Sequence, residues 1–255
     1  MRSTSNSKVL VNIENLSLSF KVSFFKSDSF RGEFTNFFKK PQHTATHSNR
    51  LVLFENLNLK IYAGDRLGLV GVNGVGKTSL CRCIAGIYKA QKGKISIDGK
   101  VRAIFDTNIA IQNELTGREN AELMGEFLYP YEPNRKQLIE DSLKFSELGD
   151  FLDVPVRFYS NGMNTRLALS VVSAKAGDIL ILDEVFDGAD QFFRKKISER
   201  ILGLIQSSGA AIFVSHSFEQ IKKTCNRTII LGREGIIFDG KPEEAEQIYK
   251  TKFAK

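Results

Sequence analysis

Residues 71–78 read GVNGVGKT, and this string restricts the possible folds of the chain more than any other feature. It matches the pattern G-x-x-x-x-G-K-[ST], in which a glycine-rich turn joins a buried strand to a helix. The neighbouring residues fit that arrangement, because an apolar run over 65–70 precedes the turn and apolar residues at helical spacing follow it over 78–90. The sequence therefore predicts a phosphate-binding turn between a strand and a helix.

Each part of this turn has a predicted role in binding a nucleotide, ATP, together with Mg²⁺. The glycines allow backbone N–H groups to point at the phosphates, and the N-terminus of the following helix adds positive potential. We expect the Lys77 ammonium to reach the β- and γ-phosphates and the Thr78 hydroxyl to coordinate Mg²⁺. The nucleotide-binding residues predicted in this segment are Gly71, Asn73, Gly74, Gly76, Lys77, Thr78 and Ser79.

The rest of the chain alternates strand and helix patterns on both sides of a helical segment. A hairpin is predicted over 93–105, with its turn at residues 98–99. Helices are predicted over 117–148, interrupted by two prolines, and over 242–249. Further strands are predicted over 9–20, 51–61, 179–182, 211–214 and 228–231. This order indicates an α/β protein whose parallel-sheet core is interrupted by a helical subdomain.

Two acidic residues, Asp183 and Glu184, come directly after the apolar strand predicted over 179–182. Asp183 stands at the carboxyl end of a sheet strand, where we expect it to hold the Mg²⁺ shell. Glu184 is expected to orient and deprotonate a water for attack on the γ-phosphate. Acid pairs are common on protein surfaces, so this prediction depends on their occurrence together with the phosphate-binding turn.

A second anion-binding helix start is predicted at residues 159–163, which read YSNGM. Phosphoryl transfer needs charge stabilisation beyond one lysine and one metal ion. Ser160 and Gly162 precede a helical run over 164–174, whose N-terminus can donate hydrogen bonds to a γ-phosphate. Taken alone, the same residues also fit an ordinary helix cap, and only the order of the motifs favours the functional interpretation.

Charge and cysteine content limit the partners and the compartment. The 36 basic and 29 acidic residues give a net charge of +7, and residues 1–50 hold eight basic against three acidic residues. A nucleic-acid surface spread over the whole chain is therefore disfavoured. Three cysteines without C-x-x-C spacing indicate a reducing compartment, and the sequence has neither a secretory signal nor a run of 18 apolar residues.

The order of these motifs resembles the nucleotide-binding subunit of ATP-binding cassette (ABC) transporters over nearly the whole chain. The phosphate-binding turn comes first, then a helical segment that ends in Ser-x-Gly, then Asp-Glu, and then a lone histidine after a strand. Three strings resemble the branch of this family that exports cell-surface polysaccharides such as O-antigen, capsule and teichoic acid. They are ELTGREN over 114–120, ELGDFLDVP over 147–155 and YSNGM over 159–163.

The resemblance implies a fold, a set of boundaries and further site residues. It implies one domain over 1–255 with a P-loop NTPase (RecA-like) core over 8–105 and 172–240, an N-terminal antiparallel β subdomain, and a helical subdomain over 106–171. It also implies that two copies sandwich two ATP molecules head to tail, because Ser160 and Gly162 would contact ATP on the opposite subunit. Asp190 would lie in the loop that connects the two sites, and His216 would touch the γ-phosphate beside the catalytic residues Glu184 and Lys77.

Two positions depart from the family pattern or leave alternatives open. The glutamine that usually couples the metal site to the membrane partner falls near residue 106, where this chain has Asp106, and Gln112 is the alternative. The aromatic residue that stacks on adenine should lie near the end of the first strand, where Phe20 stands. The Phe20 ring can stack on a purine, and it can equally be a core residue.

A basic, phenylalanine-rich insertion is predicted over 21–50. Four phenylalanines in it recur at helical spacing, which predicts one apolar face on a short helix: Phe30, Phe34, Phe37 and Phe38. This face could pack on the core, contact a membrane-embedded partner or lie at the lipid interface. The excess of basic residues favours the membrane side.

We therefore expect an ATP hydrolase that powers export of a lipid-linked polysaccharide through a separate membrane subunit. It would work as a dimer at the cytoplasmic face of the inner membrane, with no nucleic-acid partner. The chain ends soon after the helix predicted over 242–249, so we expect no appended carbohydrate-binding domain. The alternatives are the ATPase of another glycoconjugate exporter or an ABC ATPase outside transport. DNA-repair ATPases need long heptad arms, translation ATPases need two phosphate-binding turns, and a regulator without turnover needs neither Glu184 nor His216.

Overall fold

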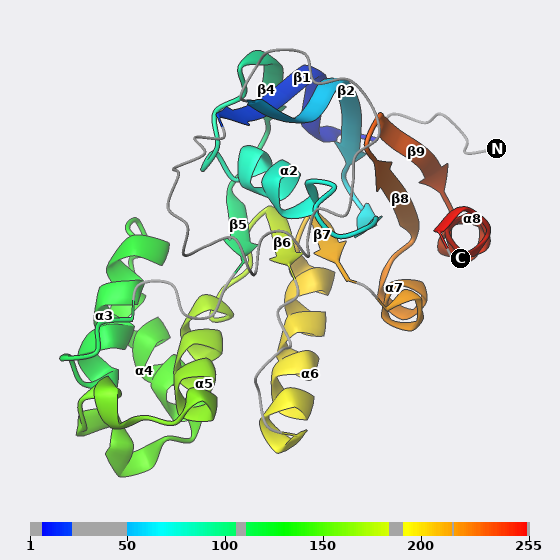
Figure 1. Cartoon of the computed structure of the whole chain (residues 1–255). Helices are drawn as coiled ribbons and strands as arrows, with labels where there is room; N and C mark the ends of the chain where they lie inside the picture. Colours follow the sequence, from blue (N-terminus) through cyan, green and yellow to red (C-terminus); the bar gives the residue numbers. More distant parts are fainter. Residues whose placement is uncertain (1–6, 22–49, 106–110, 184–190, 216, 254–255) are drawn as a thin grey trace, which may run out of the picture.

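The computed structural model describes residues 7–21, 50–105, 111–183, 191–215 and 217–253. Strands and helices alternate along them, and two short 3-10 helices precede α5 (Figure 1). The elements are β1 (Val9–Lys21), β2 (Arg50–Tyr62), β3 (Arg66–Val70), α2 (Lys77–Ile84), β4 (Lys92–Ile97), β5 (Val101–Ile104), α3 (Gly117–Leu128), α4 (Arg135–Ser146), η1 (Gly149–Asp153), η2 (Val156–Phe158), α5 (Asn161–Val172), β6 (Ile179–Asp183), α6 (Gln191–Ser207), β7 (Ala210–Val214), α7 (Phe218–Thr224), β8 (Arg227–Gly232), β9 (Gly235–Gly240) and α8 (Pro242–Phe253).

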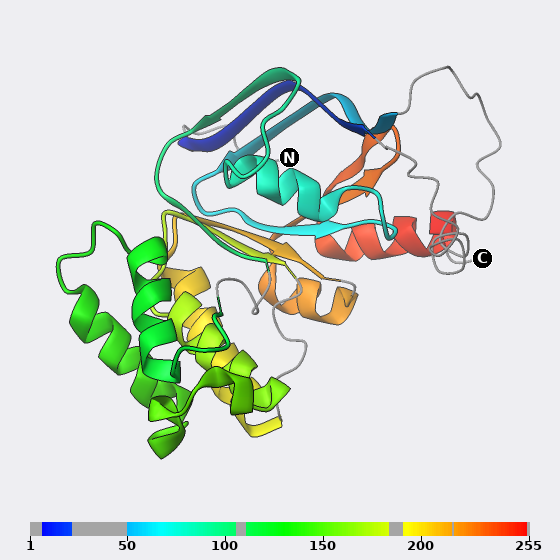
Figure 2. The same ribbon diagram turned by 60° about the vertical axis from the view of Figure 1, so that its left-hand side comes forward.

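Two sheets enclose α2, as Figures 1 and 2 show. The smaller sheet is antiparallel with the order β2-β1-β4. The larger sheet has the order β5-β6-β7-β3-β8-β9, and its strands are parallel except for β9, which pairs antiparallel with β8. In both views α3, α4 and α5 form a separate group on one side of the sheets. This is the predicted α/β architecture with an antiparallel β subdomain and an inserted helical subdomain.

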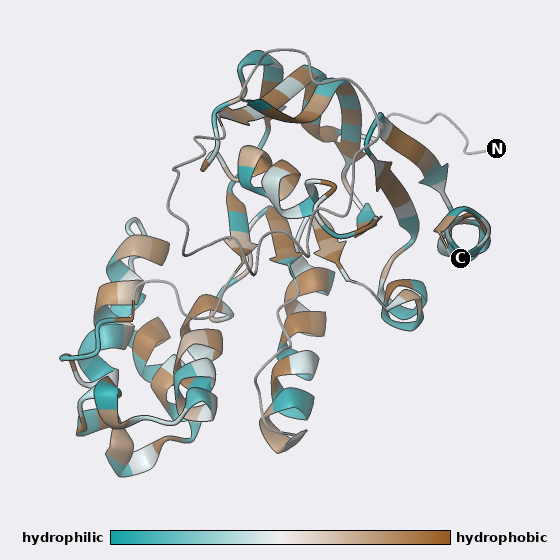
Figure 3. Ribbon diagram, in the orientation of Figure 1, coloured by the Kyte–Doolittle hydropathy of each residue, from teal (hydrophilic) through white to brown (hydrophobic). Residues whose placement is uncertain are grey.

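Three hydrophobic clusters hold these layers together. One lies between the two sheets and includes the apolar residues of α2, and a second joins the opposite face of the larger sheet to α6, α7 and α8. The third belongs to the helical group α3–α5. Figure 3 shows the matching pattern, with hydrophobic residues concentrated on the strands of the larger sheet. Such continuous apolar runs are typical of parallel strands that are covered on both faces.

A buried ion-pair network joins the smaller sheet to the larger one. The Arg227 guanidinium on β8 lies 2.7 Å from the Asp65 carboxylate and 2.5 Å from the Asp239 carboxylate of β9. It also donates a hydrogen bond of 2.9 Å to the Lys60 carbonyl oxygen of β2. The hydrogen bonds to Asp239 and then to Asp65 raise the pKa of Arg227 above its usual range, although burial opposes the charge. We call these four residues the Arg227 network.

The helix after the phosphate-binding turn is shorter than predicted. The apolar spacing predicted a helix over 78–90, but α2 ends at Ile84. Gly86 has a φ of +75°, which leaves the helical region, and Ile87 is 59% exposed. A left-handed glycine just after the last turn is a common way to end a helix, and here it overrides the apolar pattern. Residues beyond Gly86 therefore belong to the connection to β4.

The predicted hairpin over 93–105 is wrong, although both of its strands exist. β4 pairs with β1 in the smaller sheet, whereas β5 pairs with β6 in the larger sheet. The turn at Asp98 and Gly99 redirects the chain from one sheet to the other. The Asp98 N–H donates to the Leu10 carbonyl oxygen at 2.9 Å, and the Lys100 N–H donates to the Asp178 carboxylate at 2.7 Å. Long-range pairing thus decides a turn whose local signal fits a hairpin.

The insertion predicted over 21–50 lies mostly outside the described residues, including its four phenylalanines at helical spacing. The structure does describe the backbone at its two ends. Lys21 at the end of β1 pairs with Arg50 at the start of β2. The chain therefore leaves and re-enters the smaller sheet at directly opposite positions.

Candidate functional site

Three parallel strands end at the same edge of the larger sheet, directly before the predicted site segments. Leu69 of β3 lies level with Val214 of β7, and Val214 lies level with Asp183 of β6. Neighbouring strands are about 5 Å apart, so the carboxyl ends of these three strands lie side by side. The register brings together the start of the phosphate-binding turn, Asp183 and Ser215.

Two glycines of the phosphate-binding turn stand where a side chain would collide with the protein. Gly76 has a φ of +104°, and a Cβ atom there would lie 2.6 Å from the Phe54 ring. A Cβ atom on Gly71 would lie 2.5 Å from the Leu231 carbonyl oxygen. Gly76 is the N-cap of α2, so its conformation also directs the turn into the helix. The glycine pattern is therefore needed to seat the turn on β2 and β8.

Lys77 is the first residue of α2, and its side chain folds back over the turn. The residue is only 7% exposed. Its Nζ atom donates hydrogen bonds to the Gly71 carbonyl oxygen at 2.9 Å and to the Val72 carbonyl oxygen at 3.4 Å. Thr78 and Ser79 follow in the first turn and are half-buried, whereas Asn73 and Gly74 are exposed. The ammonium group and the N-terminus of α2 thus face the space enclosed by the turn.

Asp183 is buried at the end of β6, close to α2. It is 5% exposed. Burial raises the pKa of the Cys81 thiol of α2 well above its usual range, and the Asp183 carboxylate raises it further. Cys81 of α2 and Ile181 of β6 belong to the same hydrophobic cluster, so Thr78 and Asp183 stand on elements that pack on one core. Carboxylate and hydroxyl oxygens are hard ligands that suit Mg²⁺, so these residues fit the predicted metal site.

Four predicted site residues lie outside the described residues. They are Asp106, Glu184, Asp190 and His216. The residues around position 216 are held firmly, because the Ser215 hydroxyl donates to the Gln220 side chain at 2.9 Å and accepts from the Ser217 N–H at 3.0 Å. The Ser217 hydroxyl in turn accepts from the Gln220 N–H as the N-cap of α7.

Phe20 lies near the end of β1, on the smaller sheet, and is 37% exposed. It is therefore not part of the buried core, which was one of the two predicted alternatives. Its backbone pairs with Leu51 of β2. An exposed aromatic ring at this position offers a surface on which a purine can stack.

Ser160 and Gly162 lie at the start of α5, in the helical group. Ser160 is the exposed N-cap of α5, and its hydroxyl accepts a hydrogen bond of 3.2 Å from the Met163 N–H. A Cβ atom on Gly162 would lie 3.8 Å from the Ser160 hydroxyl, and beyond its own helix it would approach no other described residue within 4 Å. In Figures 1 and 2 the helical group lies apart from α2 and the phosphate-binding turn.

The three sequence strings that resemble polysaccharide exporters contact one another next to the start of α5. Thr116 forms a β-bridge with Pro155, and the Val156 N–H donates to the Leu115 carbonyl oxygen at 2.9 Å. The Tyr159 hydroxyl donates to the Phe151 carbonyl oxygen at 2.6 Å. These strings are therefore one structural unit, which fixes the start of α5.

Sequence reasoning missed the role of Asn120 within the first string. This fully buried side chain accepts from the Gln112 N–H at 2.7 Å and donates to the Gln112 and Leu115 carbonyl oxygens. It thereby ties the segment of Gln112, the alternative coupling residue, to α3. Thr116 and Glu119 form a complete capping box at the start of the same helix, and that pattern was visible in the sequence.

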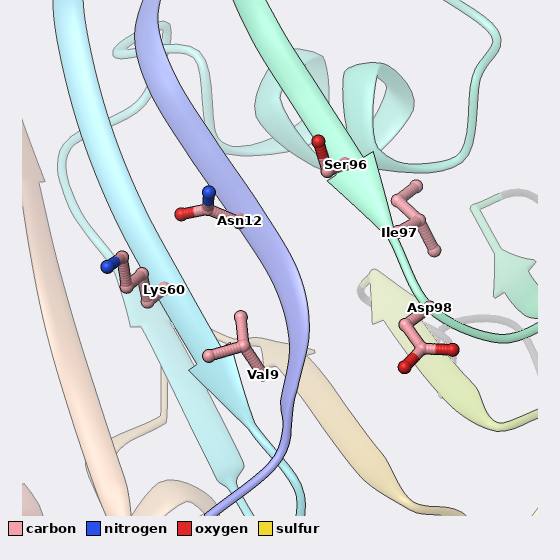
Figure 4. A pocket seen from close by; sticks show the side chains of 6 residues that line it. All are labelled: Val9, Asn12, Lys60, Ser96, Ile97 and Asp98. Atoms are coloured by element: carbon pink, nitrogen blue, oxygen red, sulfur yellow. The ribbon is translucent and has the colours of Figure 1, made fainter.

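A shallow cavity of about 270 Å³ lies on the face of the smaller sheet that α2 does not cover (Figure 4). Three of its polar residues come from adjacent strands, since Asn12 pairs with both Lys60 and Ser96, and the fourth, Asp98, directly follows β4. None of the predicted site residues that the structure describes contributes to it. The lining residues are Val9, Asn12, Lys60, Ser96, Ile97 and Asp98.

Comparison with known proteins identifies the family. The model of the family described as "ABC transporter" matches residues 54–187. The chain belongs to the ABC transporter family. The O-antigen export system ATP-binding protein RfbE of Yersinia enterocolitica is 38% identical over 185 residues, which are 72% of this chain and 77% of that protein. The teichoic acids export ATP-binding protein TagH of Staphylococcus saprophyticus is 31% identical over 219 residues, covering 86% and 80% of the two chains.

The fold agrees with solved structures of this family. A dimeric ATP-binding cassette in a post-hydrolysis state, bound to ADP and Pi, matches with a TM-score of 0.68 over 91% of this chain and 99% of that chain. The identity is 20%, so the likeness concerns the fold. The predicted P-loop fold is therefore confirmed for this ABC protein.

Proposed function

We propose that this ABC protein is the ATPase subunit that powers export of a lipid-linked cell-surface polysaccharide of the O-antigen or capsule type. The observation that carries the proposal is the shared sheet edge, where the phosphate-binding turn, the buried Asp183 and Ser215 stand at the ends of three adjacent strands. The resemblance to RfbE supports the polysaccharide as cargo. The resemblance to TagH supports teichoic acid or another glycoconjugate as the alternative, and an ABC ATPase outside transport is a third reading.

The chemistry divides among residues that the fold brings to this edge. Lys77 and the N-terminus of α2 bind the phosphates, and Phe20 stacks on the adenine. Thr78 and Asp183 would hold Mg²⁺, which supplies charge neutralisation at the β- and γ-phosphates when bound. Glu184 would orient and deprotonate the attacking water, and His216 would contact the γ-phosphate. Glu184 and His216 follow directly after β6 and Ser215, which supports these assignments.

A second copy of the chain is proposed to complete each site. Ser160 caps a helix in the group α3–α5, which lies apart from the phosphate-binding turn of its own chain. In a head-to-tail dimer, Ser160, Gly162 and the N-terminus of α5 would face ATP on the opposite subunit, and Asp190 would lie between the two sites. The dimeric cassette with the same fold supports this arrangement.

Export needs a path across the membrane that another chain is proposed to supply. Among the described residues, no helix is long and apolar enough to span a bilayer. We place the ATPase at the cytoplasmic face of the inner membrane, bound to an integral membrane subunit. Deletion of the chain should then remove the glycan from the cell surface and leave lipid-linked glycan inside the cell.

The shared site can be tested by mixing two inactive variants. Lys77→Ala removes the ammonium group proposed to bind the phosphates, and Ser160→Trp blocks the proposed contact with the opposite subunit. A mixed dimer contains one site with both parts intact, so an equal mixture should recover about a quarter of wild-type ATP hydrolysis if pairing is random. Each variant alone is the control. A mixture that remains as inactive as its components, although mixed dimers form, contradicts a site shared between subunits.

A further inference from the structure

Three residues that follow the phosphate-binding turn surround the end of β1. They are Arg82 of α2, and Tyr88 and Gln91 of the connection between α2 and β4. We propose that these residues position Phe20 as the platform for the adenine base. The inference rests on the proposed function, because it takes Phe20 as the residue that stacks on the base.

Gln91 fixes the backbone directly before Phe20. Its side-chain oxygen accepts from the Ser19 N–H at 2.6 Å, and its side-chain nitrogen donates to the Ser19 carbonyl oxygen at 2.7 Å. The Gln91 N–H also donates to the Ser17 carbonyl oxygen at 3.0 Å. The pairing of β1 with β4 ends at Ser17 and Lys92, so the Gln91 amide takes the place of the missing strand. Both backbone groups of Ser19 are thus satisfied by one side chain.

Tyr88 supports the Phe20 ring itself. The two ring centroids are 5.4 Å apart with an angle of 72° between the rings, which is the edge-to-face arrangement favoured by aromatic pairs. Tyr88 is half-buried against the hydrophobic cluster between the two sheets. A core-anchored ring therefore restricts Phe20, which would otherwise rotate as an exposed side chain.

Arg82 holds Tyr88 in turn. Its guanidinium donates a hydrogen bond of 2.8 Å to the Tyr88 hydroxyl and lies over two rings, with centroid distances of 5.5 Å to Tyr88 and 5.7 Å to Phe105. Arg82 belongs to the same short helix that begins with Lys77. The residues that bind the phosphates and the residues that support the base platform would thus both be positioned by the same helix, α2.

This arrangement predicts that Tyr88 and Gln91 affect the binding of the base and not the binding of the phosphates. A platform held in its binding geometry loses less rotational freedom when the ligand binds, so affinity rises without a new contact. Tyr88 and Gln91 act through Phe20 and are positioning residues for the base. Their loss should weaken the binding of ATP and leave the binding of a ligand without a base unchanged.

The test compares ATP with inorganic tripolyphosphate on the purified full-length chain by titration calorimetry, together with steady-state hydrolysis. An aromatic pair contributes enough that Tyr88→Leu should raise the Kd and the KM for ATP about fivefold, with kcat changed less than about twofold. The Kd for tripolyphosphate should stay at the wild-type value. Tyr88→Phe keeps the ring and should restore most of the ATP affinity.

Gln91→Ala should give the same pattern as Tyr88→Leu. Gln91→Glu is its matched control, because it keeps the size and the acceptor for the Ser19 N–H but places an oxygen against the Ser19 carbonyl. It should therefore fail to restore the ATP affinity. An equal loss for ATP and tripolyphosphate, or no loss for ATP, would overturn the inference.

Phe20→Ala separates this inference from the proposed function. If Phe20→Ala weakens ATP binding while Tyr88→Leu and Gln91→Ala do not, the supporting role is refuted and the base platform stands. If Phe20→Ala leaves ATP binding unchanged, the inference fails with the platform. The mixing experiment with Lys77 and Ser160 variants tests ATP hydrolysis independently of both results.

Discussion

Removal of the Arg227 guanidinium should destabilise the fold strongly, because it leaves buried groups without their partner. The Arg227 side chain is 10% exposed and the Asp65 side chain 5%, whereas the Asp239 side chain is 37% exposed. Breaking a buried ion pair by removing one partner costs about 3–5 kcal/mol, since the remaining charge stays buried. We expect Arg227→Met, which keeps an apolar stem of similar length, to lose about 3–5 kcal/mol of unfolding free energy.

The two carboxylates should contribute unequally. Asp239 is partly exposed, so water screens its interaction and Asp239→Asn should cost no more than about 1 kcal/mol. Asp65 is buried, and its carboxylate also accepts from the Tyr62 N–H at 3.0 Å. Asp65→Asn should therefore cost about 2 kcal/mol. The double variant Arg227→Met/Asp65→Asn leaves no buried charge in the Arg227 network. It should therefore be more stable than Arg227→Met alone.

Urea unfolding followed by far-UV circular dichroism measures these differences at neutral pH. Thermal unfolding provides a second measure, since a loss of 3–5 kcal/mol should lower the Tm by about 6–20 °C in a chain of this size. Equal urea slopes for wild type and variants ensure that the midpoint shifts report stability. Strictly additive effects of Arg227→Met and Asp65→Asn would refute the reasoning, as would equal losses for Asp65→Asn and Asp239→Asn.

Three further predictions concern turnover, export and pH. Glu184→Gln should bind ATP and trap a closed dimer, and hydrolysis at the wild-type rate would exclude Glu184 as the base. Deletion of residues 27–40 should preserve ATP binding but abolish export, and unchanged surface glycan would contradict a membrane-side role. Hydrogen bonds from Lys222 and Lys250 lower the pKa of Glu246 from 4.5 to about 2. The stabilisation by this carboxylate should therefore be complete above pH 4.5 and disappear as the pH falls to about 2, so the difference in urea midpoint between wild type and Glu246→Gln should shrink over that range. A difference that stays constant would contradict this origin.

Much of the fold could be predicted because its strongest signals are local. The apolar runs before residues 71, 183 and 215 are short, continuous and bounded by turn residues, as buried parallel strands are. The partners of β4 and β5 could not be predicted in the same way. Asp98 and Gly99 carry a hairpin signal, and only the pairing of β4 with β1 and of β5 with β6 shows that they connect two sheets.

In the candidate site, too, the local features could be predicted and the long-range contacts could not. The strand-to-helix turn that holds the glycines and Lys77 could be predicted because a phosphate-binding turn requires those residues in that order. The support of Phe20 could not, because Gln91 reaches Ser19 across a distance of 72 residues in sequence. The register of β1 with β4 creates this contact together with the early end of α2, and only Gly86, which ends the helix, leaves a signal in the sequence. Asn120 was missed for a related reason, since an asparagine within a helix usually points to solvent rather than to its own preceding loop.

The pairing of Lys21 with Arg50 has a consequence for how this protein can diverge from its relatives. Because both ends of the insertion meet at one rung of the smaller sheet, its length can change at little entropic cost and without shifting the strand register. We therefore expect that protein variants with other segments inserted between Lys21 and Arg50 still fold. Lys21 directly follows Phe20, so a force on such an inserted segment would act one residue away from the proposed adenine platform.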